Sequence, residues 1–142
     1  MSEECVPSLG VKESEKRIGD GEMSSPNSAG NSYKPKEGRL DKSGKAWCSQ
    51  QAGSYLMITL PEKTTVFGVA SQGHPSEYHW VTKYRVEVCG ETWEVDGNIN
   101  RKTVVSNMFG SSRPCEAITI TPLAWEGNKM CMRVEIYGLN EG

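Results

Sequence analysis

The chain has 142 residues, the size of one ordinary domain, and its 16 basic and 18 acidic residues give a formal net charge of −2. This balance gives no electrostatic reason to expect binding to nucleic acid or to a strongly anionic membrane. No stretch approaches the ~20 consecutive apolar residues of a membrane-spanning helix.

The N-terminus, MSEECVPSLG, lacks the apolar core of a signal peptide. We therefore expect a protein that is cytosolic or secreted by a non-classical route, or an extracellular domain whose leader has been removed. Residues 1–46 are rich in Gly, Ser, Pro, Lys and Glu, and residues 19–38 have the composition of a loop. Two interpretations are open: Ile18 and Met23 anchor this segment to a core, or it is a flexible extension.

From Trp47 onward the sequence has the pattern of β-strands separated by turns. The clean alternation of residues 83–89 is typical of a strand with one wet face. Pro61 closes the first strand, and Gly90-Glu91 turns the third into the fourth. With no convincing helical period, six to eight short strands predict a β-sandwich or barrel. The expected strands are residues 55–60, 64–70, 83–89, 92–95, 103–109, 116–121 and 131–137.

Five cysteines are present, an odd number that leaves at least one thiol free in a monomer. No pair has the C-x-x-C spacing of zinc or redox motifs. Cys89 and Cys131 have the parity of the polar faces of their strands, which predicts positions near the surface. Separate small side chains are one interpretation, and one or two disulfides in an extracellular protein are the other. The cysteines are Cys5, Cys48, Cys89, Cys115 and Cys131.

The sequence gives no support for catalysis. His74 and His79 are the only two histidines, and no G-x-S-x-G elbow or similar context accompanies them. The carboxylates are scattered, without a pair suited to glycoside hydrolysis, and no glycine-rich phosphate cradle is present. We therefore predict that the protein is not an enzyme.

Residues 72–80 bring Gln, His, Glu, Tyr, His and Trp together in one loop between two strands. Loops on a rigid framework often carry binding residues, and sugar sites combine planar polar groups with aromatic rings. Core packing is the favoured role for Trp80. The tip residues His74, Glu77, Tyr78 and His79 either contact a ligand or are merely solvated. The candidate ligand-binding residues are Arg39, Lys45, Trp47, Gln72, His74, Glu77, Tyr78 and His79.

Ordered motifs extend over nearly the whole chain. They are Leu9-Gly10 with Arg17-Ile18-x-Asp20, Gly38-Arg39-Leu40-Asp41 with Gly44-x-Ala46-Trp47-Cys48, Val69-Ala70-Ser71-Gln72-Gly73 with Trp80-Val81-Thr82-x-Tyr84-x-Val86, Gly97-Asn98 with Thr103-Val104-Val105-x-Asn107-x-Phe109, Ile118-x-Ile120-x-Pro122-x-x-Trp125, and Met132-Arg133-Val134-Glu135-Ile136-Tyr137-Gly138. In type and order they resemble the motifs of the discoidin domain family, also called the coagulation factor V/VIII type C domain.

The resemblance implies an eight-stranded antiparallel jelly-roll β-sandwich. Residues 1–142 would form a single domain with a core of about 5–139, and the N-terminal segment would be ordered. Family members bind ligands with loops, called spikes, that project from one end of the barrel. By position these loops are residues 24–34, 42–47 and 72–80.

The cysteines depart from the family pattern. Extracellular relatives usually join a Cys near the start to one directly after Tyr-Gly, but here Leu139 follows Tyr137-Gly138. The bridge that the resemblance implies for Cys5 therefore cannot form. This departure favours a discoidin-type soluble lectin over a coagulation-factor module.

The loops also differ from those of relatives that bind phosphatidylserine, which bury apolar side chains in the membrane at roughly 1.5–3 kcal/mol each. Residues 24–34 offer only Ala29 and Tyr33, and residues 42–47 offer Trp47 as the one large apolar group. Carbohydrate binding with a galactose-like preference is therefore the leading prediction. A protein-binding or phosphatidylserine-binding adhesion module and an intracellular scaffold domain are the alternatives.

The resemblance implies no required cofactor. Some relatives bind a structural calcium ion through hard oxygen ligands, and Glu37 lies near the position that this implies. The expected partners are glycans or glycoproteins, with no nucleic acid and little support for peripheral membrane contact. Assembly into oligomers is compatible with the sequence.

Overall fold

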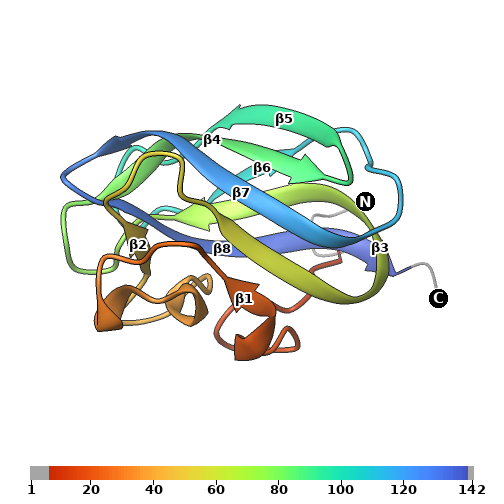
Figure 1. The fold of residues 1–142 in the computed structure, drawn as a ribbon, viewed down its shortest axis with the longest axis horizontal. Coiled ribbons are helices and arrows are strands. Elements are labelled where there is room, and N and C mark those ends of the chain that lie inside the picture. Colours follow the sequence, from red (N-terminus) through yellow and green to blue (C-terminus); the bar gives the residue numbers. More distant parts are fainter. Residues whose placement is uncertain (1–6, 141–142) are drawn as a thin grey trace.

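The computed structural model describes residues 7–140, which fold almost wholly into antiparallel β-strands (Figure 1). The helical elements in this range are three single 3-10 turns, η2 (Asp20–Glu22), η3 (Asn31–Tyr33) and η4 (Pro35–Glu37). The all-β, eight-stranded fold that the sequence predicts is thus confirmed. The strands are β1 (Met23–Ser24), β2 (Trp47–Ser49), β3 (Leu56–Gln72), β4 (Trp80–Val88), β5 (Glu91–Asp96), β6 (Val105–Met108), β7 (Cys115–Glu126) and β8 (Met130–Asn140).

Strand β3 belongs to both layers of the sandwich (Figure 1). Its first part pairs with β7 and β1, and its second part pairs with β8 and β6. One layer therefore runs β5-β4-β7-β3-β1 and the other β2-β8-β3-β6. Apolar side chains from both layers, among them Val69, Val86 and Ile136, are fully buried and form one core cluster. This packing positions the loops at the ends of the sandwich.

The sequence predicts two strands where the structure has one. We expected Pro61 to close a strand over residues 55–60, but β3 continues to Gln72, and only its pairing shifts, between Thr59 and Thr64. Proline lacks the N–H that a ladder requires, and it is tolerated here because the strand changes partners at this point. The chain passes from one layer to the other without a break.

Strands β4 and β5 form the predicted hairpin, joined by Cys89 and Gly90. Both turn residues have positive φ, 47° and 87°, as a type I′ turn requires. The alternation predicted for β4 is confirmed, because Tyr84, Val86 and Val88 are fully buried.

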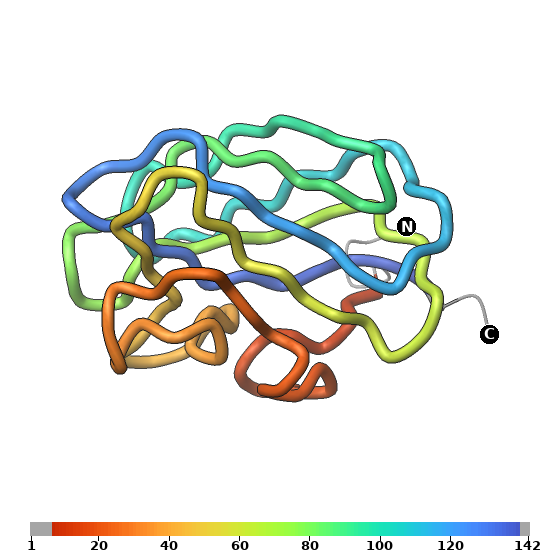
Figure 2. Tube along the Cα trace, in the orientation of Figure 1, coloured from red at the N-terminus to blue at the C-terminus, as the bar shows by residue number. Residues whose placement is uncertain are grey.

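The outer face of β8 is buried as well, although its polar residues suggested a wet face. The N-terminal part of the chain runs beside this strand (Figure 2). Glu135 on β8 accepts hydrogen bonds from the backbone N–H groups of Val11 (3.1 Å) and Lys12 (3.0 Å). The segment from residue 7 is therefore ordered, as the resemblance implies, rather than a flexible extension.

Arg39 supplies the second tie between this segment and β8. Its backbone forms an isolated bridge with Val134, and its guanidinium donates to the carbonyl of Val11 (2.9 Å) and to Asp20 Oδ1 (2.7 Å). The Arg39 hydrogen bond holds the pKa of Asp20 below its ordinary value. The side chain of Arg39 is thus a structural anchor within the fold.

Two disulfides join Cys48 to Cys131 and Cys89 to Cys115. The prediction that Cys131 lies near the surface is wrong: it faces Cys48 across the β2–β8 pair, and both are fully buried because loop residues pack over them. Cys89, in the hairpin turn, is exposed as predicted. Cys5 lies outside the described residues.

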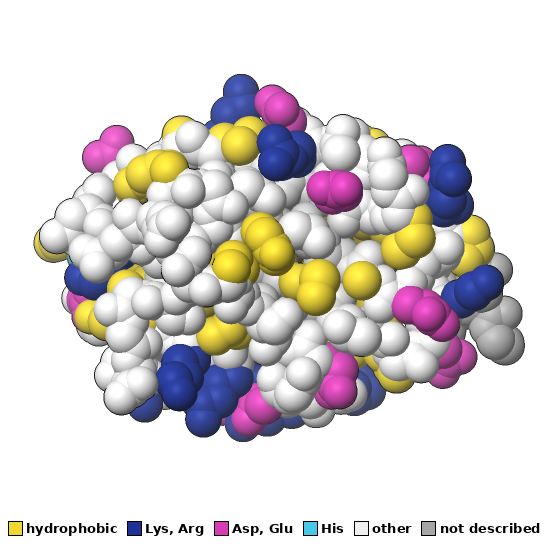
Figure 3. All heavy atoms as spheres, viewed as in Figure 1, with side chains coloured by type: hydrophobic (Ala, Val, Ile, Leu, Met, Phe, Trp, Pro, Cys, Tyr) yellow, Lys and Arg dark blue, Asp and Glu magenta, His cyan; other side chains and the backbone are white. Residues whose placement is uncertain are grey.

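The surface mixes both signs of charge. Figure 3 shows basic side chains gathered along the edge that the 3-10 turns form, with acidic side chains among them. Within residues 7–140, no helix has the length and apolar character to cross a bilayer.

Candidate functional site

The loop of residues 73–79 joins β3 to β4 at the end of the sandwich that also carries the β7–β8 turn (Figure 1). Its two ends are tied together, because the N–H of His74 donates to the carbonyl of His79 (3.0 Å). The N–H of Gly73 donates to the carbonyl of Arg101 (3.0 Å), which joins this loop to residues 97–104. A Cβ at Gly73 would lie 2.6 Å from Cβ of Trp80, so glycine permits the close approach.

His74 holds the inside of this loop. It is 2% exposed, and its Nδ1 accepts hydrogen bonds from the backbone N–H groups of Ser76 (3.1 Å) and Glu77 (3.0 Å). Burial lowers the pKa of His74 below its ordinary value of 6.5, and the Glu77 carboxylate opposes this shift. The ring is therefore neutral at pH 7, and its proton is on Nε2 because Nδ1 is an acceptor.

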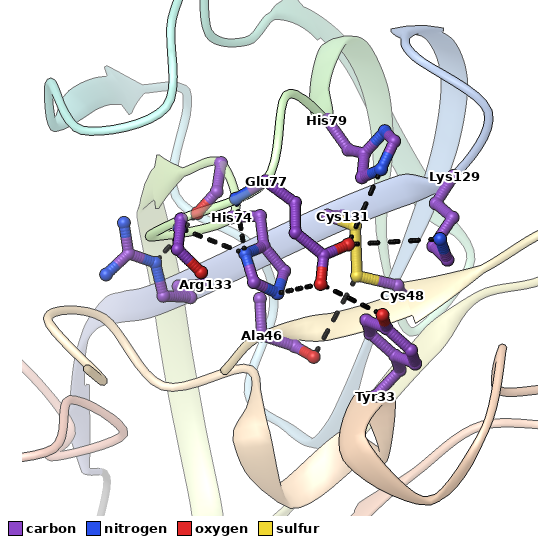
Figure 4. The surroundings of a disulfide bond; sticks show 11 residues. Tyr33, Ala46, Cys48, His74, Glu77, His79, Lys129, Cys131 and Arg133 are labelled. Carbon is purple, nitrogen blue, oxygen red and sulfur yellow. Dashed lines mark hydrogen bonds and ion pairs between the residues drawn. A yellow bond between two sulfur atoms is a disulfide. The ribbon is translucent and has the colours of Figure 1, made fainter. Parts of the chain in front are cut away.

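Glu77 lies among four other side chains, and the five residues come from three parts of the chain (Figure 4). The Tyr33 hydroxyl donates to Glu77 Oε2 at 2.9 Å, and Nε2 of His74 lies 3.7 Å from the same oxygen. Nε2 of His79 lies 3.5 Å and Nζ of Lys129 lies 3.8 Å from Glu77 Oε1. We call these five residues the Glu77 cluster. The Glu77 side chain is 36% exposed, so the cluster can be reached from solvent.

Two contacts fix the protonation and the position of the Tyr33 side chain in this cluster. The hydrogen bond to Glu77 raises the pKa of Tyr33, so its hydroxyl remains a donor at neutral pH. Lys129 Nζ lies 5.2 Å from the centroid of the Tyr33 ring, within the range of a cation–π contact. Tyr33 thus links η3 to both the loop of residues 73–79 and the β7–β8 turn.

His79 packs beneath the β7–β8 turn. Its side chain is 14% exposed, and its Nδ1 is buried with no hydrogen-bond partner among the described residues. A Cβ at Gly127 would overlap this nitrogen, and the φ of 90° at Gly127 also favours glycine. Burial lowers the pKa of His79, with a further contribution from Lys129, so this ring is also neutral at pH 7.

The disulfide between Cys48 and Cys131 lies close to the Glu77 cluster (Figure 4). With Ala46 the two cysteines form a small buried cluster, and Ala29 and Tyr33 pack against it. This covalent support lies under the loop that carries Tyr33, and it fixes β2 to β8 at that point.

Arg133, on the outer face of β8, holds three loops together. Its Nε donates to the carbonyl of Gly73 (2.7 Å), Nη1 donates to that of Lys42 (2.7 Å), and Nη2 donates to that of Arg101 (3.2 Å). Gln72 makes a parallel link: Oε1 accepts from the N–H of Asp41 (2.8 Å), and Nε2 donates to a carbonyl at residue 102 (2.9 Å). Both side chains set the spacing of the loops.

Two cavities flank the loop of residues 73–79. The first, which we call the loop cleft, has a volume of about 410 Å³ and lies between residues 41–44 and the tip of the loop. The second, the Tyr78 pocket, has a volume of about 280 Å³. Lys102 lines both. The loop cleft is lined by Asp41, Lys42, Ser43, Gly44, Gln72, Pro75, Ser76, Lys102 and Arg133, and the Tyr78 pocket by Tyr78, Trp80, Asn100, Arg101, Lys102 and Thr103.

Tyr78 is the exposed aromatic ring of the site, at 73% exposure. The guanidinium carbon of Arg101 lies 5.0 Å from the centroid of its ring, and the ring of Trp80 meets it edge-on at 6.3 Å. Arg101 also donates to the carbonyl of Pro75 (3.1 Å), which fixes it against the loop. The ring is therefore oriented although it faces solvent.

The structure brings the four predicted tip residues together in one site, three of them in the Glu77 cluster and Tyr78 beside it. Other residues lie in environments that differ from those predicted. Trp47 is fully buried in the core, whereas Trp80, for which we favoured core packing, is half-buried and lines the Tyr78 pocket. Arg39 is only 1% exposed and, like Gln72, serves to hold the fold together.

Lys45 and Glu37 lie together apart from the tip. Lys45 Nζ lies 3.9 Å from Glu37 Oε2, and Lys42 Nζ lies 3.4 Å from Glu37 Oε1. The Glu37 carboxylate thus faces two ammonium groups, which compete with any cation for its oxygens. Among residues 7–140, no group of three or more His, Cys, Asp or Glu side chains is arranged to hold a metal ion. Calcium binding at Glu37 remains a prediction from the resemblance.

Sequence reasoning missed part of the site. Arg101 and Lys102 lie on a loop that was not among the three predicted spikes, and Lys129 lies on the β7–β8 turn. Arg133 was recognised only as part of a strand motif. The asparagines at residues 98 and 100 were a sequence signal for an ordered loop at this place. In the structure, Asn100 accepts hydrogen bonds from two following backbone N–H groups and so shapes the loop.

A β-sandwich whose loops build an ordered, ring-lined polar site at one end has the architecture of a ligand-binding module. The family model of the F5/8 type C domain matches residues 22–136, and the chain belongs to this family. Domains of this type are in general non-catalytic binding modules, although a similar domain also occurs beside an alginate lyase domain.

Relatives and solved structures agree with this assignment. Lactadherin from Bos taurus is 31% identical over 127 residues, a match that covers 75% of this chain and 30% of lactadherin. The chain therefore spans about a third of the length of this curated relative. Discoidin II from Dictyostelium discoideum has a TM-score of 0.75 at 17% identity, covering 84% of this chain and 55% of that one. The family 32 CBM of NanJ from C. perfringens, solved with galactose, has a TM-score of 0.65 at 20% identity, covering 84% and 96%. These likenesses show the jelly-roll fold.

Proposed function

We propose that the chain is a non-catalytic carbohydrate-binding module that takes galactose-type sugars at the Glu77 cluster and the cavities beside it. One observation carries this proposal: a partly exposed carboxylate is held by a hydroxyl, two imidazoles and an ammonium group that come from three separate loops. Such an array presents fixed donors and acceptors to a ligand rich in hydroxyl groups.

The chemistry of the cluster suits a sugar. A sugar hydroxyl both donates and accepts, so it can donate to Glu77 and accept from Lys129. The exposed ring of Tyr78 offers an apolar surface for the C–H face of the sugar. Because neighbouring side chains already hold these groups, little ordering entropy is lost on binding.

The comparisons support this choice of ligand without deciding it. The NanJ module, which shares the fold, was solved in complex with galactose. A second module of the same fold from Clostridium perfringens was solved with GalNAc-β-1,3-galactose.

A glycan array followed by calorimetry with a galactoside tests the proposal. We expect Glu77→Gln to lower affinity about tenfold, because a charge-assisted hydrogen bond contributes about 1.5–3 kcal/mol. Glu62→Gln, the same substitution at an exposed position in the bend of β3, is the control and should leave affinity unchanged. An array without hits would reject carbohydrate binding, and galactoside binding that His79→Ala leaves unchanged would reject this site.

A second candidate function is contact with a phosphatidylserine membrane. It is favoured by Ile99, which is 83% exposed, on the loop that also carries Arg101. One inserted isoleucine contributes only about 1.5–3 kcal/mol, so this contact alone would be weak. Co-sedimentation with vesicles that contain or lack phosphatidylserine separates the two functions, and Ile99→Ser should abolish any binding that depends on insertion.

A further inference from the structure

Two buried arginines of this chain differ in how their charge is balanced. Arg39 is 1% exposed and forms an ion pair with Asp20 at 2.7 Å. Arg133 is 4% exposed, yet its guanidinium touches three backbone carbonyls, and no carboxylate among residues 7–140 forms an ion pair with it. Buried charges in proteins are usually paired, so the unpaired Arg133 calls for an explanation.

Arg133 opens onto the loop cleft, and so does a second unpaired cation. Lys102 is exposed at the edge of the cleft and has no ion pair within the described part of the chain. Lys42, by contrast, directs its ammonium group to Glu37 (3.4 Å) and Glu13 (3.7 Å). The cleft therefore contains two cations that form no ion pair with a carboxylate of the described chain.

The rest of the cleft lining consists of Asp41, Ser43, Gly44, Gln72, Pro75 and Ser76. Asp41 is the one carboxylate among the lining residues, and it opposes the lowering of the Arg133 pKa that burial causes. Ser43 and Ser76 line the cleft from two different loops. Of the five N–H groups of Arg133, three are taken by carbonyls. Its other two N–H groups have no hydrogen-bond acceptor within the described residues.

We propose that the loop cleft binds the carboxylate or sulfate group of an acidic saccharide. This inference rests on the proposed function, because the neutral part of the same ligand would be held by the Glu77 cluster. Ser76 lines the cleft and Glu77 is the next residue, so the two sites lie on the same loop. Lys102 supplies an ion pair at the edge, and Arg133 supplies charge-assisted hydrogen bonds from the floor.

An anionic lipid headgroup would also meet these cations, but the surroundings favour the saccharide. The cleft is concave, with a volume of about 410 Å³, within the range of small-molecule sites. A membrane site needs several exposed apolar side chains around the basic groups, whereas none of the cleft-lining residues is an exposed large hydrophobic. Lipid binding is therefore the competing outcome of the test.

The test uses two sugars that differ only at the acidic group. Galacturonic acid has a carboxylate where galactose has a hydroxymethyl group, and both are titrated into the full chain by calorimetry. We expect galacturonate to bind about tenfold tighter than galactose, and Lys102→Gln to weaken galacturonate binding more than galactose binding, so that most of that preference is lost. Lys63→Gln, the same charge change in the β3 bend, is the control. Added NaCl should weaken galacturonate binding only.

The possible results separate the two proposals. Equal affinity for both sugars would overturn the acidic site and leave carbohydrate binding standing. A preference for galacturonate that survives Lys102→Gln would also overturn the assignment to this cleft. Absence of binding by either sugar, together with binding to phosphatidylserine vesicles that Lys102→Gln weakens, would overturn both proposals in favour of a lipid surface.

Discussion

The hydroxyl of Tyr33 donates to Oε2 of Glu77 across 2.9 Å and so joins two loops whose residues are 44 positions apart in the chain. The same carboxylate faces Lys129 with its other oxygen. Three segments that carry no regular pairing with one another thus meet at one side chain. Their relative positions depend on this carboxylate and on the groups that hold it.

This relationship predicts energetic coupling between the two residues. We expect Tyr33→Phe and Glu77→Gln each to weaken galactoside binding, and the double variant to lose less than the sum of the two. Residues that share a hydrogen bond typically show coupling of about 0.5–3 kcal/mol. Calorimetry on the four proteins of the cycle measures it. Strict additivity would show that the hydrogen bond plays no part in ligand binding.

Acidification should destabilise the loop end. Burial lowers the pKa values of both His74 and His79 in the folded protein. Below pH 6.5, the ordinary histidine pKa, these two side chains are therefore protonated more readily in the unfolded chain than in the folded one. Their contribution to stability is therefore present above pH 6.5 and is lost as pH falls below it. Thermal melts between pH 7.5 and 5 measure this loss. His74→Asn, which keeps an acceptor near the position of Nδ1, should flatten the profile, and an unchanged profile would contradict the assignment.

Removal of each of the two disulfides should have a different effect on stability and on sugar binding. The Cys48–Cys131 bond closes a span of 83 residues and the Cys89–Cys115 bond one of 26, so chain entropy predicts losses of roughly 4.5 and 3.5 kcal/mol. Paired alanine substitutions and chemical denaturation measure both. Only the first pair supports Tyr33, so only its removal should also weaken sugar binding. Equal effects on binding would contradict this.

Thiol titration provides a direct check on the bridges. The chain has five cysteines and four of them are bonded, which leaves one. Without reductant, the denatured protein should therefore show one reactive thiol. Five reactive thiols under the same conditions would favour the intracellular scaffold alternative, since disulfides persist in oxidising compartments.

Gly127 should be more sensitive to substitution than its backbone angle alone requires. Gly127 and Gly53 have the same φ of 90°, but a Cβ at Gly127 would collide with His79, whereas a Cβ at Gly53 would meet nothing within 4 Å. Gly53→Ala should cost about 1–2 kcal/mol of stability from φ alone. Gly127→Ala should cost more and should also weaken galactoside binding. Similar effects of the two substitutions would rule out steric displacement of His79.

Sequence patterns predicted the framework well. Alternation identified β4 and its hairpin, because side chains on a strand report burial directly. Motif order identified the family and the end of the sandwich that carries the loops. His74 and His79 were singled out as polar rings in a loop between two strands, and Glu77 lies between them in the same loop.

The remaining features depend on contacts that no local pattern contains. Residues 131–137 alternate as if one face were wet, but distant loops and the N-terminal segment cover that face, so Arg133 and Glu135 are buried. The same reason explains why Trp47, a predicted ligand-binding residue, is buried in the core, and why Trp80, expected in the core, is half-buried. Burial of a tryptophan is decided by which segments pack over it, and here those segments are far away in sequence.

The hydrogen bonds from Arg133 to backbone carbonyls affect which amino-acid substitutions the loops of this domain can accept. Every residue type carries a carbonyl, so the side chains at Lys42, Gly73 and Arg101 do not provide the acceptors that Arg133 uses. Apart from Gly73, where a Cβ would collide with Trp80, side chains on these loops can therefore be exchanged while the distance between the loops is retained. Evolution or protein engineering can therefore introduce new binding surfaces on these loops while the β-sandwich that carries them stays the same.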